Sequence, residues 1–349
     1  LAVIREELLE IKEKYGDPRR TEIQRAEGEL ADEDLIPDEE IVITITHHGY
    51  IKRLPISTYK SQKRGGRGVL AMGTKENDFV EHLFVTSCHA NLLFFTNKGK
   101  VYQLKAYELP EMSRAARGTP IINLIPIAPR ETINAVIPIR DFTEDGYLFF
   151  ATKEGIVKRT KLAAFENIRK GGLIAIHLRE EDELIGVRLT DGRQEVILGT
   201  RNGMSIRFPE TDVRPMGRAA TGVKGITLDA DDTVIGIDIV RDAANVLVVT
   251  EKGFGKQTPM DEYRPQTRGG KGLKTLNVTE RNGHVVALKV VEPNDDVMII
   301  TQHGIMIRLN VSEVSVFGRI TQGVKLIQVR EEDDDYVSTV ARIPAGDEE

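Results

Sequence analysis

The chain has 349 residues, of which 40% are hydrophobic and 29% are charged, and its formal net charge is −6. This composition predicts a globular protein with one large or two average domains. The single cysteine, Cys88, excludes an internal disulfide framework, and we take it for a small buried hydrophobe in a reducing compartment. No apolar run approaches 18 residues and no signal peptide is visible, so no membrane span is expected.

Charge is segregated along the chain. Residues 1–40 contain six Lys or Arg against fourteen Asp or Glu, and residues 331–349 contain one against eight. The body between them, residues 41–330, therefore carries a net charge of +9. A basic body between acidic ends favours a polyanion as the partner of the body. The acidic ends either solubilise the chain or compete with that polyanion.

Residues 1–16 are predicted to form a helix. Apolar residues recur there at helical spacing, at Leu1, Ile4, Leu8, Ile11 and Tyr15, and Pro18 cannot continue a helix. Residues 17–39 form a polar, acidic linker in this interpretation, and residues 346–349 a short acidic tail. The chain begins at Leu1 without a methionine, so we expect the helix to come from a missing N-terminal domain of a longer protein.

From residue 40 on, the sequence repeats with a period near 50. The tetrapeptide T-x-x-G follows a run rich in β-branched and aromatic residues six times, and each glycine is followed by a second alternating run. Two such runs around a turn that ends in glycine predict a β-hairpin. The turn glycines are Gly49, Gly99, Gly155, Gly203, Gly253 and Gly304.

A second glycine follows 19 residues after the first in five repeats and 17 residues after it in the third. Two further strand-like runs come after it, which makes four strands per unit and six units. The sequence therefore predicts an all-β fold, a six-bladed propeller of four-stranded blades over residues 40–345; a linear β-solenoid is the alternative. The predicted blades span residues 40–88, 89–142, 143–190, 191–240, 241–291 and 292–345.

Cations recur at fixed positions before the second glycine. An arginine stands four residues before it in five repeats and is displaced by one in the third, and a cation stands one residue before it in three repeats. We call these residues the loop column: Arg64, Arg67, Arg114, Arg117, Arg169 with its neighbour Lys170, Arg218, Arg268, Lys271 and Arg319.

Another set of cations lies three or four residues after the hairpin glycine. We call it the hairpin column, and it comprises Lys52, Arg53, Lys158, Arg159, Arg207, Lys256 and Arg308. Because a radial fold repeats each position around a ring, both columns predict a belt of cations that contacts the DNA backbone. No recognition helix or zinc-finger spacing appears, so no base reading is expected. The alternative for both columns is a structural role, in which these side chains brace the blades. The alternative for any single Arg-Gly segment is a flexible surface loop without a ligand.

An enzyme is not favoured by any motif. Gly253–Lys256 and Gly269–Gly272 do not match the phosphate loop G-x-x-x-x-G-K-[ST], and the histidines lack metal-ligand spacing. We expect no catalytic residue, no metal and no cofactor in this chain. A protein-interaction propeller is the rival function, although the lack of tryptophan and the 5% of aromatic residues disfavour it.

The segment QKRGGRG is the most complete copy of the repeated loop. It comprises Gln62, Lys63, Arg64, Gly65, Gly66, Arg67 and Gly68, and it resembles the seven-residue box of the C-terminal domain of DNA gyrase A, a component of a type IIA topoisomerase. The six repeats resemble the six blades of that domain, so the resemblance covers nearly the whole chain. The corresponding C-terminal domain of topoisomerase IV, with a degraded or missing box, is the alternative.

The resemblance implies a β-pinwheel, in which neighbouring blades exchange strands and the box lies where the first blade meets the last. It further implies non-sequence-specific binding and right-handed wrapping of double-stranded DNA, which serves negative supercoiling by an ATP-dependent enzyme. Gyrase B and the N-terminal part of gyrase A are the implied partners, and that longer assembly uses ATP and Mg²⁺. The implied location is the cytoplasm, at the bacterial nucleoid, and we expect the isolated chain to be a monomer that touches no membrane.

Overall fold

The computed structural model describes residues 1–17, 32–58, 78, 80–113, 115–142, 145–303, 305–329 and 335–345. Contacts divide the chain into two units, Leu1–Pro37 and Asp38–Glu349. The first unit contains helix α1 (Ala2–Tyr15), in which every side chain is exposed, and the 3₁₀ turn η1 (Asp32–Leu35). The predicted helix is thus present. The box Gln62–Gly68, most of the predicted linker and the tail 346–349 lie outside the described residues. No described helix is long and apolar enough to cross a bilayer.

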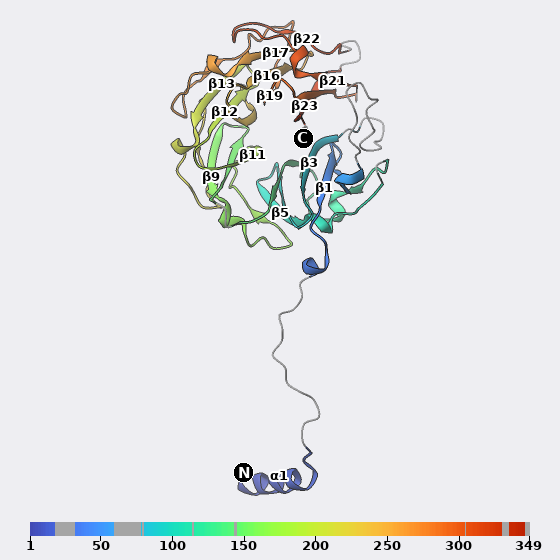
Figure 1. Cartoon of the computed structure of the whole chain (residues 1–349). Helices are drawn as coiled ribbons and strands as arrows, with labels where there is room; N and C mark the ends of the chain where they lie inside the picture. Colours follow the sequence, from blue (N-terminus) through green and yellow to red (C-terminus); the bar gives the residue numbers. More distant parts are fainter. Residues whose placement is uncertain are drawn as a thin grey trace. The chain divides into compact units, whose positions relative to one another are not determined.

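The second unit consists of antiparallel sheets (Figure 1). In spatial order, the first three are β3 (Val80–Ser87), β1 (Glu40–Thr46), β2 (Tyr50–Pro55), β6 (Thr119–Pro120); β10 (Leu173–Ile174), β5 (Lys100–Lys105), β4 (Asn91–Thr96), β7 (Ile133–Ile139); and β11 (Leu184–Thr190), β8 (Tyr147–Thr152), β9 (Ile156–Lys161), β14 (Val223–Lys224). The next three are β15 (Val234–Ile239), β12 (Glu195–Thr200), β13 (Met204–Pro209), β18 (Leu273–Lys274); β19 (Val285–Val291), β16 (Asn245–Thr250), β17 (Phe254–Pro259), β22 (Val324–Lys325); and β21 (Met306–Asn310), β20 (Asp296–Thr301), β23 (Val337–Ile343).

Five of these sheets borrow a strand from the following repeat. The short strand β14, for example, comes from the fourth repeat but pairs with β9 of the third, through Val223↔Val157 and Lys224↔Ile156. The sixth sheet has three strands among the residues that the structure describes. The six-bladed, all-β prediction is confirmed. The repeat pattern alone predicts that all four strands of a unit belong to one blade, and the structure corrects this prediction, because the run after the second glycine joins the preceding blade.

The sheets are arranged radially (Figure 1). Neighbouring inner strands lie side by side from β7 through β11, β15 and β19 to β23, and β23 lies beside β3. The sixth sheet is therefore next to the first, which closes the ring. In Figure 1, β19, β23 and β11 lie toward the middle, while β9, β17 and β22 lie toward the rim. Each short borrowed strand is thus the outer edge of its sheet.

The T-x-x-G hairpin owes its geometry to both of its recurring residues. In the third repeat Gly155 has φ 77° and donates its N–H to the Thr152 carbonyl at 3.0 Å, a conformation that glycine adopts without a Cβ penalty. The Thr152 hydroxyl oxygen accepts a hydrogen bond from the backbone N–H of Ile156 at 3.2 Å, so that this N–H has a partner within the turn. The same threonine bond recurs in the first, fourth, fifth and sixth repeats, at Thr46, Thr200, Thr250 and Thr301.

The second glycine is needed for packing on the neighbouring blade. A Cβ at Gly222 would lie 2.5 Å from the Val157 carbonyl oxygen, and one at Gly272 would lie 2.3 Å from the Ser205 carbonyl oxygen. Both glycines have positive φ, 107° and 79°. Each loop thus continues into its borrowed strand only because no side chain separates it from the blade on which it lies.

The core lies between neighbouring sheets. Strand β4 is buried at all six positions, as expected when both faces of a strand are covered. Between the second and third sheets, Phe95 packs edge-on against Phe150 with ring centroids 5.6 Å apart, and Phe165 lies 6.1 Å from Phe150. Burial of each such ring contributes about 1.5–3 kcal/mol, so removing one would strongly destabilise that junction.

The remaining 3₁₀ turns are η2 (Ile56–Thr58), η3 (Ala106–Glu108), η4 (Ile121–Asn123), η5 (Leu162–Phe165), η6 (Glu210–Asp212), η7 (Met260–Glu262) and η8 (Val311–Glu313).

Candidate nucleic-acid interface

The lysines of the hairpin column are interior. Lys52, Lys158 and Lys256 each have 0% exposure, and each ammonium donates to two backbone carbonyls, at least one of which belongs to the next repeat's loop. The partners are the carbonyls of Ser113 and Ala116 for Lys52, of Ala175 and Arg218 for Lys158, and of Gly318 and Arg319 for Lys256. The prediction that these three lysines contact DNA is wrong for this conformation, because the nitrogens cannot reach a partner outside the ring.

Burial changes the acidity of these lysines. Burial, together with the nearby Arg218 guanidinium, lowers the pKa of Lys158 to about 7. Burial also lowers the pKa of Lys256 to about 8, with Glu262 opposing and Arg319 supporting the shift. The pKa of Lys52 is lowered by burial as well. Transfer of an ammonium out of water disfavours its charged form, and the acceptors that replace water around Lys158 and Lys256 are carbonyl oxygens.

Three arginines of the hairpin column also have partners inside the ring. Arg53 donates to the Leu109 carbonyl at 2.8 Å and pairs with Glu111. Arg159 is buried, stacks over the Tyr147 ring at 4.6 Å and pairs with Glu210 at 3.5 Å. Arg207 binds Glu195 and the Tyr263 carbonyl. The guanidinium groups of these three arginines therefore brace blades, which corrects the prediction for the buried Arg159, while contact of Arg53 and Arg207 with DNA stays a prediction.

Arg308 is the exposed member of the hairpin column. Its side chain is 62% exposed and forms an ion pair with Asp296. Exposed pairs of this kind contribute little to stability and can exchange partners. Arg308 therefore remains a candidate for contact with a polyanion.

The loop column is divided between bracing and exposed side chains. Arg268 donates to the carbonyls of Asp212 and Lys224, and Arg319 donates to the Lys274 carbonyl and lies 3.9 Å from Glu262. Both arginines thus tie a loop to the preceding blade, and Arg218 is half-buried as well. Arg64, Arg67 and Arg114 lie outside the described residues.

Four other loop cations face solvent. Arg117, Arg169 and Lys170 are exposed and form no ion pair with another described residue. The Lys271 side chain is 72% exposed, and its pair with Asp229 at 3.1 Å is exposed at both ends. These side chains are exposed enough to contact an external anion, and whether they contact DNA stays a prediction.

Sequence reasoning missed a further set of exposed cations. The borrowed strands β14, β18 and β22 each end in an exposed lysine: Lys224, Lys274 and Lys325. Because these strands are the outer edges of three consecutive sheets, the lysines lie at the perimeter of the ring. The signal was present in the sequence, since a lysine stands two residues after the second glycine in the fourth, fifth and sixth repeats.

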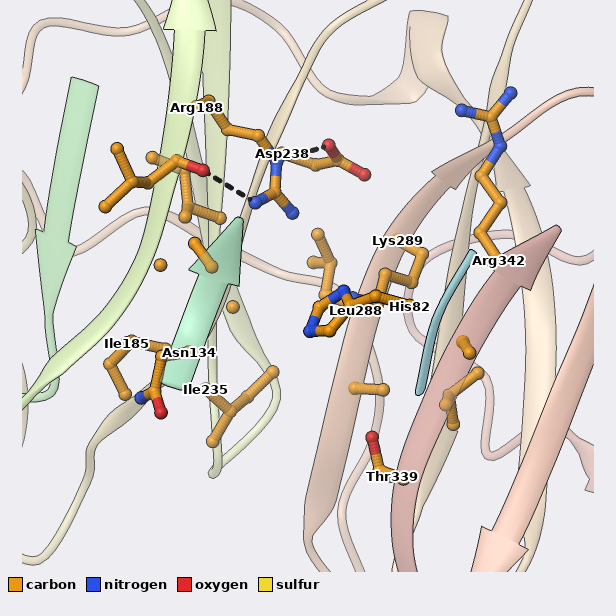
Figure 2. A pocket seen from close by; sticks show the side chains of 18 of the residues that line it. His82, Asn134, Ile185, Arg188, Ile235, Asp238, Leu288, Lys289, Thr339 and Arg342 are labelled. Carbon is orange, nitrogen blue, oxygen red and sulfur yellow. Dashed lines mark hydrogen bonds and ion pairs between the residues drawn. The ribbon is translucent and has the colours of Figure 1, made fainter. Parts of the chain in front are cut away.

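The inner strands surround a pocket of about 490 Å³ (Figure 2). In this pocket Arg188 donates to Asp238 at 3.1 Å, and the Val290 N–H donates to the other Asp238 oxygen. Burial favours a raised pKa for Asp238, but Arg188 and Lys289 outweigh it and lower the pKa. Asp238 therefore joins three adjacent sheets as a carboxylate.

One group of described residues could hold a metal ion by proximity. Ligand atoms of Asp38, Cys88 and His89 lie within 4.8 Å of one another. The Ser87 hydroxyl already donates to Asp38 at 2.5 Å and, with His89 and Arg140, outweighs burial and lowers the pKa of Asp38. A cation there would compete with Arg140, and the Cys88 thiol is buried, as expected from its sequence context.

A closed ring of radially arranged antiparallel sheets defines the chain as a β-propeller. The model of the family described as DNA gyrase C-terminal domain, β-propeller, matches residues 40–87, 90–140, 146–191, 194–241, 244–292 and 295–344. The chain belongs to this family.

Relatives and solved structures agree with that assignment. The DNA gyrase A protein of Halalkalibacterium halodurans is 69% identical over all 349 residues, and the chain spans 42% of its length. The structure of a DNA gyrase A C-terminal domain matches with a TM-score of 0.70 at 26% identity, covering 88% of this chain and all of that one. The C-terminal domain of DNA topoisomerase IV matches with a TM-score of 0.77 at 29% identity, covering 89% of this chain and 95% of that one. The resemblance read from the sequence is confirmed.

Proposed function

We propose that this chain binds double-stranded DNA without sequence preference and wraps it in a right-handed sense around the perimeter of the ring. The observation that carries the proposal is the row of exposed lysines on consecutive outer strands, Lys224, Lys274 and Lys325. The gyrase family of the chain supports DNA as the polyanion. The wrapped DNA would be presented for negative supercoiling by the longer protein.

The energetics require many weak contacts. Bending 20–30 base pairs by 40–90° costs about 1–6 kcal/mol, and a wrap along a larger part of the ring costs more. Cations spread over several blades offset this cost through counterion release, so no single side chain should be decisive. If about six to ten phosphates are neutralised, affinity falls by about 10³–10⁵ between 50 and 200 mM salt.

The chemistry of strand passage is assigned to other regions of the longer protein. In this proposal the chain is not catalytic and uses no cofactor or metal, whereas ATP and Mg²⁺ serve the assembly that it forms with gyrase B and the N-terminal part of gyrase A. That assembly would act in the cytoplasm, at the bacterial nucleoid. The isolated chain is proposed to be a monomer.

A topological experiment tests the wrap. A singly nicked plasmid is ligated with increasing amounts of the chain, the protein is removed, and linking number is resolved on chloroquine gels. Positive supercoils left by the intact chain, and absent with Gln62–Gly68 replaced by alanine, would support right-handed wrapping that depends on this segment.

The remaining outcomes separate the alternatives. Binding by both proteins without a change in linking number would favour a domain that binds but does not wrap, as expected for the topoisomerase IV alternative, whose structural similarity is close. No binding at low salt would refute the DNA function and leave the protein-interaction propeller.

A further inference from the structure

The junctions between neighbouring blades are of two kinds. The residue three positions after the hairpin glycine is a lysine in the first, third and fifth repeats and an uncharged residue in the second, fourth and sixth. In every junction that the structure describes, this side chain faces the loop of the next repeat. The residues are, in repeat order, Lys52, Tyr102, Lys158, Ile206, Lys256 and Ile307.

Each lysine fixes the loop that it faces. Lys256 donates to the carbonyls of Gly318 and Arg319 at 2.5 and 2.7 Å, and Lys52 binds two carbonyls of its loop at 3.0 and 3.1 Å. Lys158 binds one carbonyl of its loop, that of Arg218, and joins it to the Ala175 carbonyl of its own repeat. These bonds to buried nitrogens restrict the loops. We call residues 113–118, 217–222 and 318–323 the pinned loops.

The other junctions have an uncharged contact instead. The Tyr102 ring lies against Gly172, where a Cβ would come within 2.6 Å of it, and Ile206 lies against Gly270 and Gly272. The loops concerned, residues 167–172 and 267–272, each contain two adjacent glycines. We call them the glycine-pair loops. In the fifth repeat the pair lies three and two residues before the second glycine, where the pinned loops hold Ala115-Ala116, Ala219-Ala220 and Ile320-Thr321. In the third repeat the pair consists of Gly171 and the second glycine itself.

One glycine of each pair has no role inside the ring. A Cβ on Gly171 would meet nothing within 4 Å, and one on Gly270 would meet nothing closer than 3.7 Å. Neither has positive φ, so alanine would fit and would reduce the entropy of the unfolded chain. Glycine also serves where a ligand must approach the backbone closely.

Gly171 is exposed and Gly270 is half-buried, and the backbone N–H groups of both are without a hydrogen-bond acceptor in the described part of the ring. Exposed cations stand beside both, Arg169 and Lys170 in one loop and Lys271 in the other. An open N–H next to exposed ammonium and guanidinium groups suits a phosphate oxygen.

We propose that DNA phosphates dock on the backbone of the two glycine-pair loops, at Gly171 and Gly270, whereas the pinned loops act only as positioning elements of the ring. This inference rests on the proposed function. It divides the repeated loops, which are alike in sequence, into docking and positioning classes according to the residue that faces them. Two docking loops on separate blades would hold the DNA at spaced points, and the outer-strand lysines would neutralise it in between.

The test uses three matched glycine substitutions in the full chain. Gly171→Ala and Gly270→Ala add a methyl group at the docking positions, and Gly217→Ala adds one in a pinned loop, where a Cβ also meets nothing within 4 Å. Affinity for a fluorescent linear duplex is measured by anisotropy at fixed salt, after urea unfolding has shown that each variant is as stable as the parent. We expect each docking variant to bind about tenfold more weakly, because it loses one charge-assisted hydrogen bond to a phosphate. We expect no loss of affinity for Gly217→Ala.

A charge series gives an independent reading. Lys170→Gln and Lys271→Gln should each reduce the slope of log affinity against log salt by about 0.9, if each neutralises one phosphate. If both docking variants bind the duplex as tightly as the parent chain, the inference is overturned. An equal loss of affinity in Gly217→Ala would also overturn it. If the parent chain itself does not bind duplex DNA at low salt, the proposed function is refuted. That result is distinguishable from the results that overturn only the inference about the glycine-pair loops.

Discussion

Burial of the Lys158 ammonium should make the stability of the ring depend on pH. Its pKa is about 7 in the folded chain and about 10.4 in an unfolded one. Between these values the unfolded chain binds a proton that the folded chain has released, so the free energy of unfolding rises with pH. The contribution is about 1.4 kcal/mol per pH unit, or about 2.7 kcal/mol between pH 7.5 and 9.5. Below pH 7 the folded chain retains the proton and this dependence vanishes. A neutral amine still has two N–H donors for the carbonyls of Ala175 and Arg218, so the loop stays attached.

Urea unfolding at several pH values measures this slope. Lys158→Met retains length and apolar volume but cannot titrate, so the difference between the two slopes isolates Lys158 from all other groups. Lys170→Met, an exposed lysine of the same repeat, is the matched control and should keep the parental slope. Equal slopes for the parent and Lys158→Met would refute the reasoning. That result would mean that the two carbonyls hold the ammonium charged despite its burial.

Four further outcomes follow from the same contacts. Lys256→Met should abolish a similar slope that begins nearer pH 8, read by the same urea titration. Gly222→Ala should lower the unfolding free energy by more than about 2 kcal/mol, because φ is 107° and the Val157 carbonyl oxygen lies 2.5 Å from the new Cβ, while Gly217→Ala should stay within about 0.5 kcal/mol. Thr152→Val should cost about 1 kcal/mol in the same assay, since the Ile156 N–H loses its acceptor. Replacing the outer-strand lysines 224, 274 and 325 by glutamine should reduce the salt slope of DNA binding by up to about 2.7, whereas Lys12→Gln in α1 should leave it unchanged.

The hairpins could be predicted from the sequence because their determinants are local. Thr152 and Gly155 are three residues apart, and the bonds that define the turn join only residues 152–156. The runs on either side have the β-branched and aromatic character of buried strands. Repetition of this signal six times fixed the number of blades.

Strand exchange could not be predicted from the repeat alone. The pairing of β14 with β9 joins residues 66 and 68 positions apart, through only two residues on β14, Val223 and Lys224. A two-residue strand has no hydrophobic period from which to infer its partner. The decisive contact is the close approach of Gly222 to Val157, which depends on where the neighbouring blade lies.

The hairpin column shows why a periodic cation need not be a surface cation. Its lysine positions align with Tyr102, Ile206 and Ile307 of the other repeats, and superposed positions share their burial. An apolar residue in the same column was therefore a signal that the lysines face inward, where carbonyls replace water around the ammonium.

That signal would not have sufficed for the outer strands. Lys224 aligns with Ile174, yet both are exposed, because the short strands β14 and β10 are edges of their sheets. Lys158, by contrast, belongs to β9, which has a strand on either side and a neighbouring blade against its face. Whether a cation repeated on a strand is exposed is thus decided by which strand of the sheet carries it. Since the edge strand is supplied by the following repeat, the exposure of its lysines at the perimeter is set by pairing between repeats rather than by the sequence of any one of them.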